Sequence, residues 1–147
     1  MKMHSVVKAT GSLKITVTDK DGAIIDERDI NNLVVTAGKT HIASRMVGTS
    51  SNVMSHMGLG TDNTSPAAGD TALGAEVGRA SLTSYTASTN TLTAVATFSA
   101  GVATGALTEA GLFNDASTGD MLCRTTFSTV NKGASDTVSI TWTITIS

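Results

Sequence analysis

Residues 136–146 at the end of the chain alternate without interruption between apolar and polar side chains. From 137 to 145, serine or threonine occupies every second position. Successive side chains of a β-strand point to opposite faces, so this segment predicts a long strand with one buried and one solvated face. β-branched residues on both faces favour the extended backbone further. The apolar positions are Val138, Ile140, Trp142, Ile144 and Ile146.

The same alternation predicts further strands along the chain. Leu13, Ile15 and Val17 share one face, and a turn at 19–22 leads back through residues 23–27 to complete an N-terminal hairpin. Residues 29–35 are expected to continue as an irregular extended stretch that bends at Asn31 and Asn32. The remaining predicted strands are 53–59, 78–85, 91–98, 107–113 and 121–127, with 130–133 as the link to the last strand.

One segment, between Thr36 and Gly48, predicts an α-helix. Thr36 is a suitable N-cap and Gly48 a suitable C-terminal stop. A helix of about eleven residues is not stable alone, so it is expected to pack on the sheets. Its predicted apolar stripe consists of Ala37, Ile42, Ala43, Met46 and Val47.

Many short strands, frequent turns and one short helix predict an all-β fold, specifically a jelly-roll-like β-sandwich. The length suits one domain, which we assign to residues 12–147. Residues 1–11 have no hydrophobic period and are predicted to form an N-terminal arm that reaches a neighbour, or an ordered first strand. The predicted core includes Phe98, Phe113, Phe127, Ile140, Trp142 and Ile144.

Charged residues make up only 15% of the chain, below the roughly 25% that is typical of soluble domains. Low charge is typical of a subunit whose surface is largely covered by neighbours, although a compact β-domain can show it too. The net charge of −2 provides no basic field to attract nucleic acid. The composition therefore favours an assembled protein without a nucleic-acid partner.

The single cysteine, Cys123, excludes an internal disulfide and a secreted disulfide scaffold. The first residues lack the apolar run of a signal peptide, and no stretch reaches transmembrane length. We expect a chain that is made in the cytoplasm and has no membrane partner.

The chemistry-bearing side chains form no recognisable catalytic or metal-binding motif. The loop 61–70 carries Asp62, Asn63 and Asp70, oxygen ligands that could bind calcium, but it lacks the spacing and closing glutamate of an EF-hand. Capping of turns is the favoured role of these residues. The histidines lack metal-site spacing and a nucleophile or acid partner in sequence. We expect no enzyme activity, no cofactor and no metal. The histidines are His4, His41 and His56.

Glu109 interrupts the apolar segment 106–113. A carboxylate in apolar surroundings needs a cation or backbone donors, and Arg79 or Arg124 is the expected partner. Glu76 lies three residues before Arg79 and is a second candidate for pairing. A structural ion pair is favoured over a catalytic acid, because no second carboxylate flanks Glu109.

Several short segments occur in an order that resembles a small β-domain of tailed-bacteriophage virion proteins, including capsid decoration (cement) proteins and head or tail fibre proteins. The resemblance spans roughly residues 30–146 and rests on the segments as a set. The segments are 32–38, 57–61, 70–73 with Glu76 and Arg79, 108–113, 121–125 and 138–146.

The resemblance implies a non-enzymatic virion protein on the outer surface of the capsid, which bridges capsid subunits. The implied partners are the major capsid protein and copies of the chain itself, as a dimer or trimer. A tail, neck or fibre adaptor, or a host-binding module, is the alternative, but one short domain without shaft repeats favours decoration. The expected interface residues are Met1, Lys2, Met3, His4, Val6 and Lys8 in the arm and Asp62, Asn63 and Pro66 in the loop.

Overall fold

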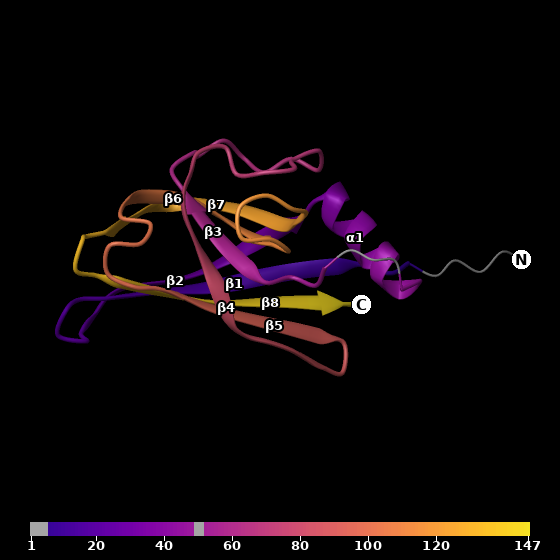
Figure 1. The fold of residues 1–147 in the computed structure, drawn as a ribbon, viewed down its shortest axis with the longest axis horizontal. Helices are drawn as coiled ribbons and strands as arrows, with labels where there is room; N and C mark the ends of the chain where they lie inside the picture. The colour runs from indigo at the N-terminus through magenta and orange to yellow at the C-terminus, as the bar shows by residue number, and fades with distance from the viewer. Residues whose placement is uncertain (1–5, 49–51) are drawn as a thin grey trace, which may run out of the picture.

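The computed structural model describes residues 6–48 and 52–147, which form a closed antiparallel barrel of eight strands with one helix at its end (Figure 1). The strand order around the barrel is β1-β2-β7-β6-β3-β4-β5-β8. The prediction of an all-β fold with one short helix is confirmed. The elements are β1 (Ala9–Thr18), β2 (Ile24–Val34), α1 (Thr36–Met46), β3 (His56–Gly60), β4 (Glu76–Ser88), β5 (Thr91–Phe98), β6 (Gly105–Phe113), β7 (Met121–Lys132) and β8 (Thr137–Ile146).

Two strands close the barrel by changing partners along their length. β2 pairs with β1 through residues 24–32 and then with β7 at Leu33 and Val34. β4 pairs with β3 through residues 76–81 and then, from Leu82 onward, with β5, with a register shift between Leu82 and Ser84. The jelly-roll-like sandwich is therefore not confirmed, since the described strands form one continuous barrel in which β5 lies beside β8 and β6 beside β7.

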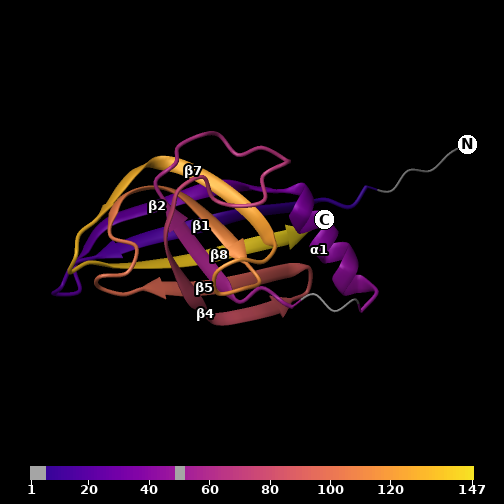
Figure 2. The same cartoon turned by 45° about the horizontal axis from the view of Figure 1, so that its top comes forward.

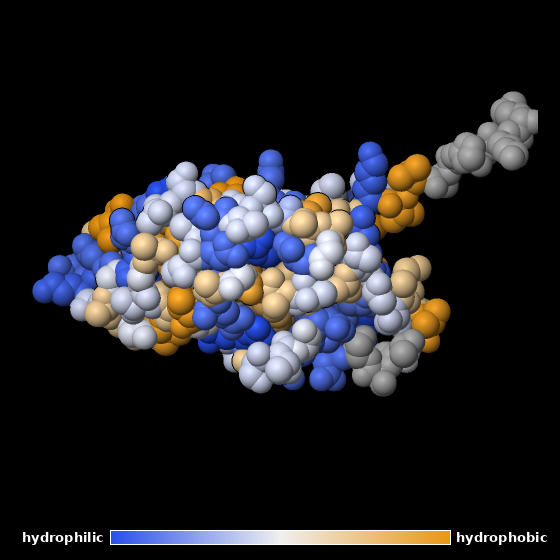
Figure 3. All heavy atoms as spheres, turned by 90° about the horizontal axis from the view of Figure 1, so that it is seen from above, coloured by the Kyte–Doolittle hydropathy of each residue, from blue (hydrophilic) through white to orange (hydrophobic). Residues whose placement is uncertain are grey.

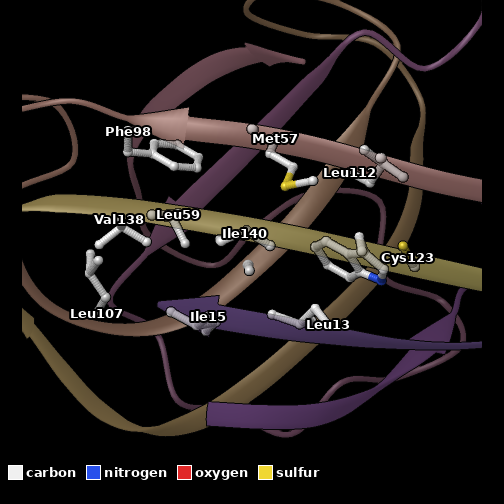
Figure 4. Close-up of a cluster of buried hydrophobic side chains, with 14 of the residues drawn as sticks. Leu13, Ile15, Met57, Leu59, Phe98, Leu107, Leu112, Cys123, Val138 and Ile140 are labelled. Atoms are coloured by element: carbon white, nitrogen blue, oxygen red, sulfur yellow. The ribbon is translucent and has the colours of Figure 1, made fainter. Parts of the chain in front are cut away.

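The barrel interior is filled by the alternate side chains that the sequence pattern predicts. Leu13 of β1 lies opposite Trp142 of β8, and Ile15 lies opposite Ile140. Figure 4 shows labelled side chains from β1, β3, β5, β6, β7 and β8 pointing into the same interior. Phe98, Ile140, Trp142 and Ile144 are buried in this cluster, whereas Phe127 is only partly buried at its edge.

A second, smaller apolar cluster lies apart from the interior cluster. Phe113 packs there with Val35, Leu73 and Met121. Leu73 comes from the loop 61–75 between β3 and β4, which arches over β6 and β7 in both ribbon views (Figures 1 and 2). β6 is buried at nearly every position because it carries the main core on one face and this loop on the other.

Strand boundaries differ from the predictions where a pairing partner overrides a local turn signal. Residues 9–11, assigned to the arm, lie in β1 and pair with β8. The predicted bend at Asn31 and Asn32 is wrong, because both residues pair with β1 inside a continuous β2. β7 extends to Lys132 because its end pairs with residues 105–107 of β6, so most of the predicted link at 130–133 is strand.

The helix is present, and its predicted apolar stripe is buried only in part: Ile42 packs against the interior cluster and Ala37 against the second cluster, whereas Ala43 is exposed. Met46 and Val47 are 81% and 80% exposed, and the buried residues are Gly38 and His41. A Cβ atom at Gly38 would overlap the backbone of Leu122 in β7, so only glycine permits this close approach, and the approach determines which helix face is buried. The N-cap is Val35 rather than Thr36, whose N–H group donates to the Ala68 carbonyl oxygen at 2.8 Å.

Replacing Trp142 with alanine should lower the free energy of unfolding by about 3–5 kcal/mol, because it removes the largest fully buried side chain. Trp142→Phe should cost less, since the indole Nε1 has no hydrogen-bond partner among the described residues. Denaturant titration followed by circular dichroism measures both changes. A red-shifted, easily quenched indole fluorescence in the wild-type protein would contradict the buried position.

Candidate functional site

The loop 61–75 is the longest irregular segment among the described residues, and its two ends are joined. It leaves β3 after Gly60 and enters β4 at Glu76. The N–H group of Thr61 donates to the Ala75 carbonyl oxygen at 3.0 Å, which closes the neck of the loop. Compact surface loops with adjoining ends are frequently functional. We therefore treat this loop and the residues beneath it as the candidate site.

Glu109 of β6 lies beneath the neck of this loop and is completely buried. Its Oε2 atom accepts hydrogen bonds from the backbone N–H groups of Asp62 at 3.0 Å and Ala75 at 2.7 Å. Its Oε1 atom accepts one from Gly74 at 2.9 Å. One carboxylate thus binds backbone donors from both ends of the loop. Gly60 makes this approach possible, because a Cβ atom there would lie 2.5 Å from Glu109 Oε2.

Arg124 of β7 provides the positive charge that Glu109 needs. Its Nε and Nη2 atoms both lie 3.1 Å from Glu109 Oε1, and only 3% of its side chain is exposed. Its Nη1 atom donates to the Thr64 carbonyl oxygen at 3.0 Å and to Asp70 Oδ2 at 3.1 Å. Asp62 Oδ2 lies 3.9 Å from Nη2. The guanidinium therefore links the sheet to the middle of the loop.

Arg79 does not pair with Glu109; it holds a different turn. It donates to both carboxylate oxygens of Glu76, at 2.8 and 2.7 Å, and lies 3.7 Å above the ring centroid of Phe113. Its Nη1 atom also donates to the carbonyl oxygens of Asp115 and Thr118. Backbone N–H groups of Ser117 and Thr118 lower the pKa of the Asp115 carboxyl group. The turn 114–120 is thereby fixed beside the loop.

The predicted interface residues of the loop divide into two groups. Asp62 and Asp70 turn toward Arg124, and hydrogen bonds from Thr64 lower the pKa of the Asp62 carboxyl group. Asn63 is exposed and Pro66 is partly exposed. Among the described residues, no group of three histidine, cysteine or acidic side chains could hold a metal ion. The Arg124 guanidinium occupies the position between Asp62, Asp70 and Glu109.

Of the predicted arm residues, Met1, Lys2, Met3 and His4 lie outside the described part of the chain. Val6 and Lys8 are exposed. Lys8 exchanges backbone hydrogen bonds with Ser147, at 2.6 and 2.8 Å, so the β1–β8 pairing continues past the end of β1.

The two described histidines and the cysteine either contact neighbouring side chains or are buried in the fold. His56 contacts the hydroxyl groups of Ser55 at 2.8 Å and Ser81 at 3.2 Å. His41 is buried, with its Nδ1 atom 3.8 Å from Asp120 Oδ2, and burial lowers the pKa of its imidazole. Burial raises the pKa of the Cys123 thiol well above its ordinary value, so the thiol stays protonated.

Sequence reasoning missed an apolar groove of about 760 Å³ at the α1 end of the barrel. The only sequence signal without a predicted burial partner was the apolar pair Val6–Val7, in a segment that lacks a hydrophobic period. No helix in the described ranges is long and apolar enough to cross a membrane. The groove lining includes Val6, Val7, Lys8, Lys39, Ile42, Met46 and Ile146.

Comparison with known proteins produced no match to a family model, a curated protein or a solved structure.

Arg124→Met should lower the free energy of unfolding by about 3–5 kcal/mol, because it leaves the buried Glu109 carboxylate without its cation. Protease cleavage within the loop 61–75 should become faster than in the wild-type protein. Lys14→Met is the matched control, since the Lys14–Glu27 pair is about half exposed and should contribute nothing measurable. Equal stability of both variants would refute the bracing role of Arg124.

Stability should fall as the pH decreases through the ordinary histidine pKa of 6.5. Burial lowers the pKa of His41 in the folded chain, so the unfolded chain takes up this proton first and is favoured in acid. Thermal unfolding at about pH 7.5 and about pH 5.5 measures this difference above the range where most carboxylates titrate. His41→Gln should flatten the dependence, and an unchanged slope in this variant would exclude His41 as its source.

Proposed function

We propose that the chain is a non-enzymatic structural protein of a tailed-phage virion, a decoration protein that binds the outer surface of the capsid and stabilises contacts between its subunits. The partners are the major capsid protein and further copies of the chain, without nucleic acid or membrane. Two observations support the proposal. One is the sequence resemblance, and the other is that hydrogen bonds to Glu109 and Arg124 hold the loop 61–75 in place.

The bracing favours a binding role for the loop. Long irregular loops are uncommon in compact domains unless they are functional or disordered. Burying two charges is costly unless both are fully satisfied, and here the satisfied pair serves to hold the loop. A loop that is ordered before binding loses little conformational entropy when a partner covers it.

The outer face of the loop suits contact with another protein surface. Asp62 and Asp70 are the only charged residues of the loop, and both turn toward Arg124. The centres of protein interfaces are depleted in charge, so this neutral face favours close packing over ion pairing. We assign it to the contact with the capsid. Its exposed positions include Asn63, Ser65, Ala67 and Ala68.

The mechanism of stabilisation is mass action. A subunit that binds the assembled shell and not the dispersed capsid protein shifts the equilibrium toward the shell. Each contact can be modest, because many copies act on one particle.

Shells that lack this protein should assemble but rupture at a lower temperature or a milder osmotic shock than complete particles. Adding purified wild-type protein back should restore the resistance, and genome release followed by a dye measures it. If protein-free shells were equally robust and labelled protein bound only tails or host cells, the fibre-adaptor or host-binding alternative would replace this proposal.

A pair of variants connects this result to the loop. Ala67→Glu places a charge on the neutral outer face and should weaken co-sedimentation with shells by about tenfold or more. Ala87→Glu, at a position that is also exposed but lies in the β4–β5 hairpin, should bind as the wild type does. Equal binding of both variants would exclude the loop as the contact.

A further inference from the structure

The two ends of the barrel's long axis carry different chemistry. Figure 1 has α1 and the C-terminus at one end and the β1–β2 turn at the other, and Figure 2 agrees. We call residues 19–25 the hairpin tip and the apolar groove beside α1 the end groove.

The end groove exposes apolar side chains next to two lysines. Val7 is 77% exposed and Met46 81% exposed, and Ile42 and Ile146 complete the apolar lining. Figure 3 shows hydrophobic side chains at the right-hand end of the molecule, the end at which Figure 1 has α1. Lys8 and Lys39 also line the groove and are exposed. Exposed apolar surface with a polar rim is typical of an interaction site.

The hairpin tip has the complementary character. Ile24 and Ile25 are 61% and 53% exposed, directly after a turn that contains Asp19 and Asp21. Asp19 Oδ1 accepts hydrogen bonds from the N–H groups of Asp21 and Ala23, at 2.9 and 3.0 Å, so the turn is ordered.

A third carboxylate lies close to the tip. Asp136 directly precedes Thr137, which pairs with Thr18 next to Asp19. Against Lys20 and Lys132, which interacts with Asp136, these three carboxylates still leave this end of the barrel net negative. The end groove, with Lys8 and Lys39, has the opposite sign.

We propose that the hairpin tip of one copy docks into the end groove of a second copy. Ile24 and Ile25 fill the apolar lining, while the carboxylates beside them face the lysines of the groove. Contact between two like ends would instead bring like charges together, which disfavours a two-fold symmetric pair. The contact is heterologous, so repeated copies form a closed ring or an open filament. The proposal concerns the isolated chain and does not depend on capsid binding.

Two complementary variants test the contact. Ile24→Ser with Ile25→Ser disables the tip and leaves the groove, whereas Met46→Glu disables the groove and leaves the tip. All three positions are exposed, so both proteins should fold, and the Trp142 fluorescence checks this. Val77→Ser is the matched control, since Val77 is 44% exposed on β4, outside both surfaces.

Sedimentation velocity should show self-association of the wild type at concentrations on the order of 100 µM, weakened by salt. Each disabled variant should associate at least about tenfold more weakly, and the control should match the wild type. An equimolar mixture of the two disabled variants should form a one-to-one complex, because one intact tip meets one intact groove.

Other outcomes overturn the proposal. Association of the tip variant alone at wild-type strength would indicate contact between like ends. A monomeric wild type at about 1 mM would indicate that another protein or another part of the chain covers the groove. A mixture that stays monomeric would exclude the head-to-tail contact.

Discussion

The buried Glu109–Arg124 pair is the interaction on which the outer half of the structure depends. A carboxylate with no access to water must keep its cation and its hydrogen-bond donors, or it destabilises the fold. Three of those donors are backbone N–H groups at the two ends of the loop 61–75. The loop therefore cannot lift from β6 without leaving a charge unsatisfied, and its position is coupled to the stability of the barrel.

This coupling extends from the loop to the helix. Ala68, near the middle of the loop, accepts the hydrogen bond from the N–H group of Thr36 at the start of α1. The helix then lies against β7 through Gly38, and its far end presents Met46 beside the N-terminal residues. One buried network thus supports two surfaces, the neutral face of the loop and the apolar groove at the barrel end.

Local sequence pattern predicts much of this arrangement. Which side chains meet across neighbouring strands depends on the strand register, which the pattern does not give. The alternation around Trp142 predicts the buried face of β8, and the apolar setting of Glu109 predicts a cationic partner. The choice between Arg79 and Arg124 needed the β6–β7 register, which places Arg124 opposite Gly111, two residues from Glu109 on the same face. The buried face of α1 was predicted only in part, because tertiary contact at Gly38 outweighs hydrophobic periodicity in a short helix and leaves Met46 exposed. Barrel closure depends on strands that change partners, which no local pattern indicates.

Barrel closure also restricts how the chain can associate. A sheet with a free edge can add a strand from a neighbour, but most strands of this barrel are paired on both sides, and one-sided stretches such as residues 24–32 of β2 are few. The charged residues are few, and several of them (Glu76, Arg79, Glu109 and Arg124) are committed to internal networks. The surface left for partners is therefore more neutral than the composition alone implies. Shape and apolar contact must then provide most of the affinity, so an ordered loop, a projecting hairpin tip and a preformed groove are the features from which such a chain can build an assembly.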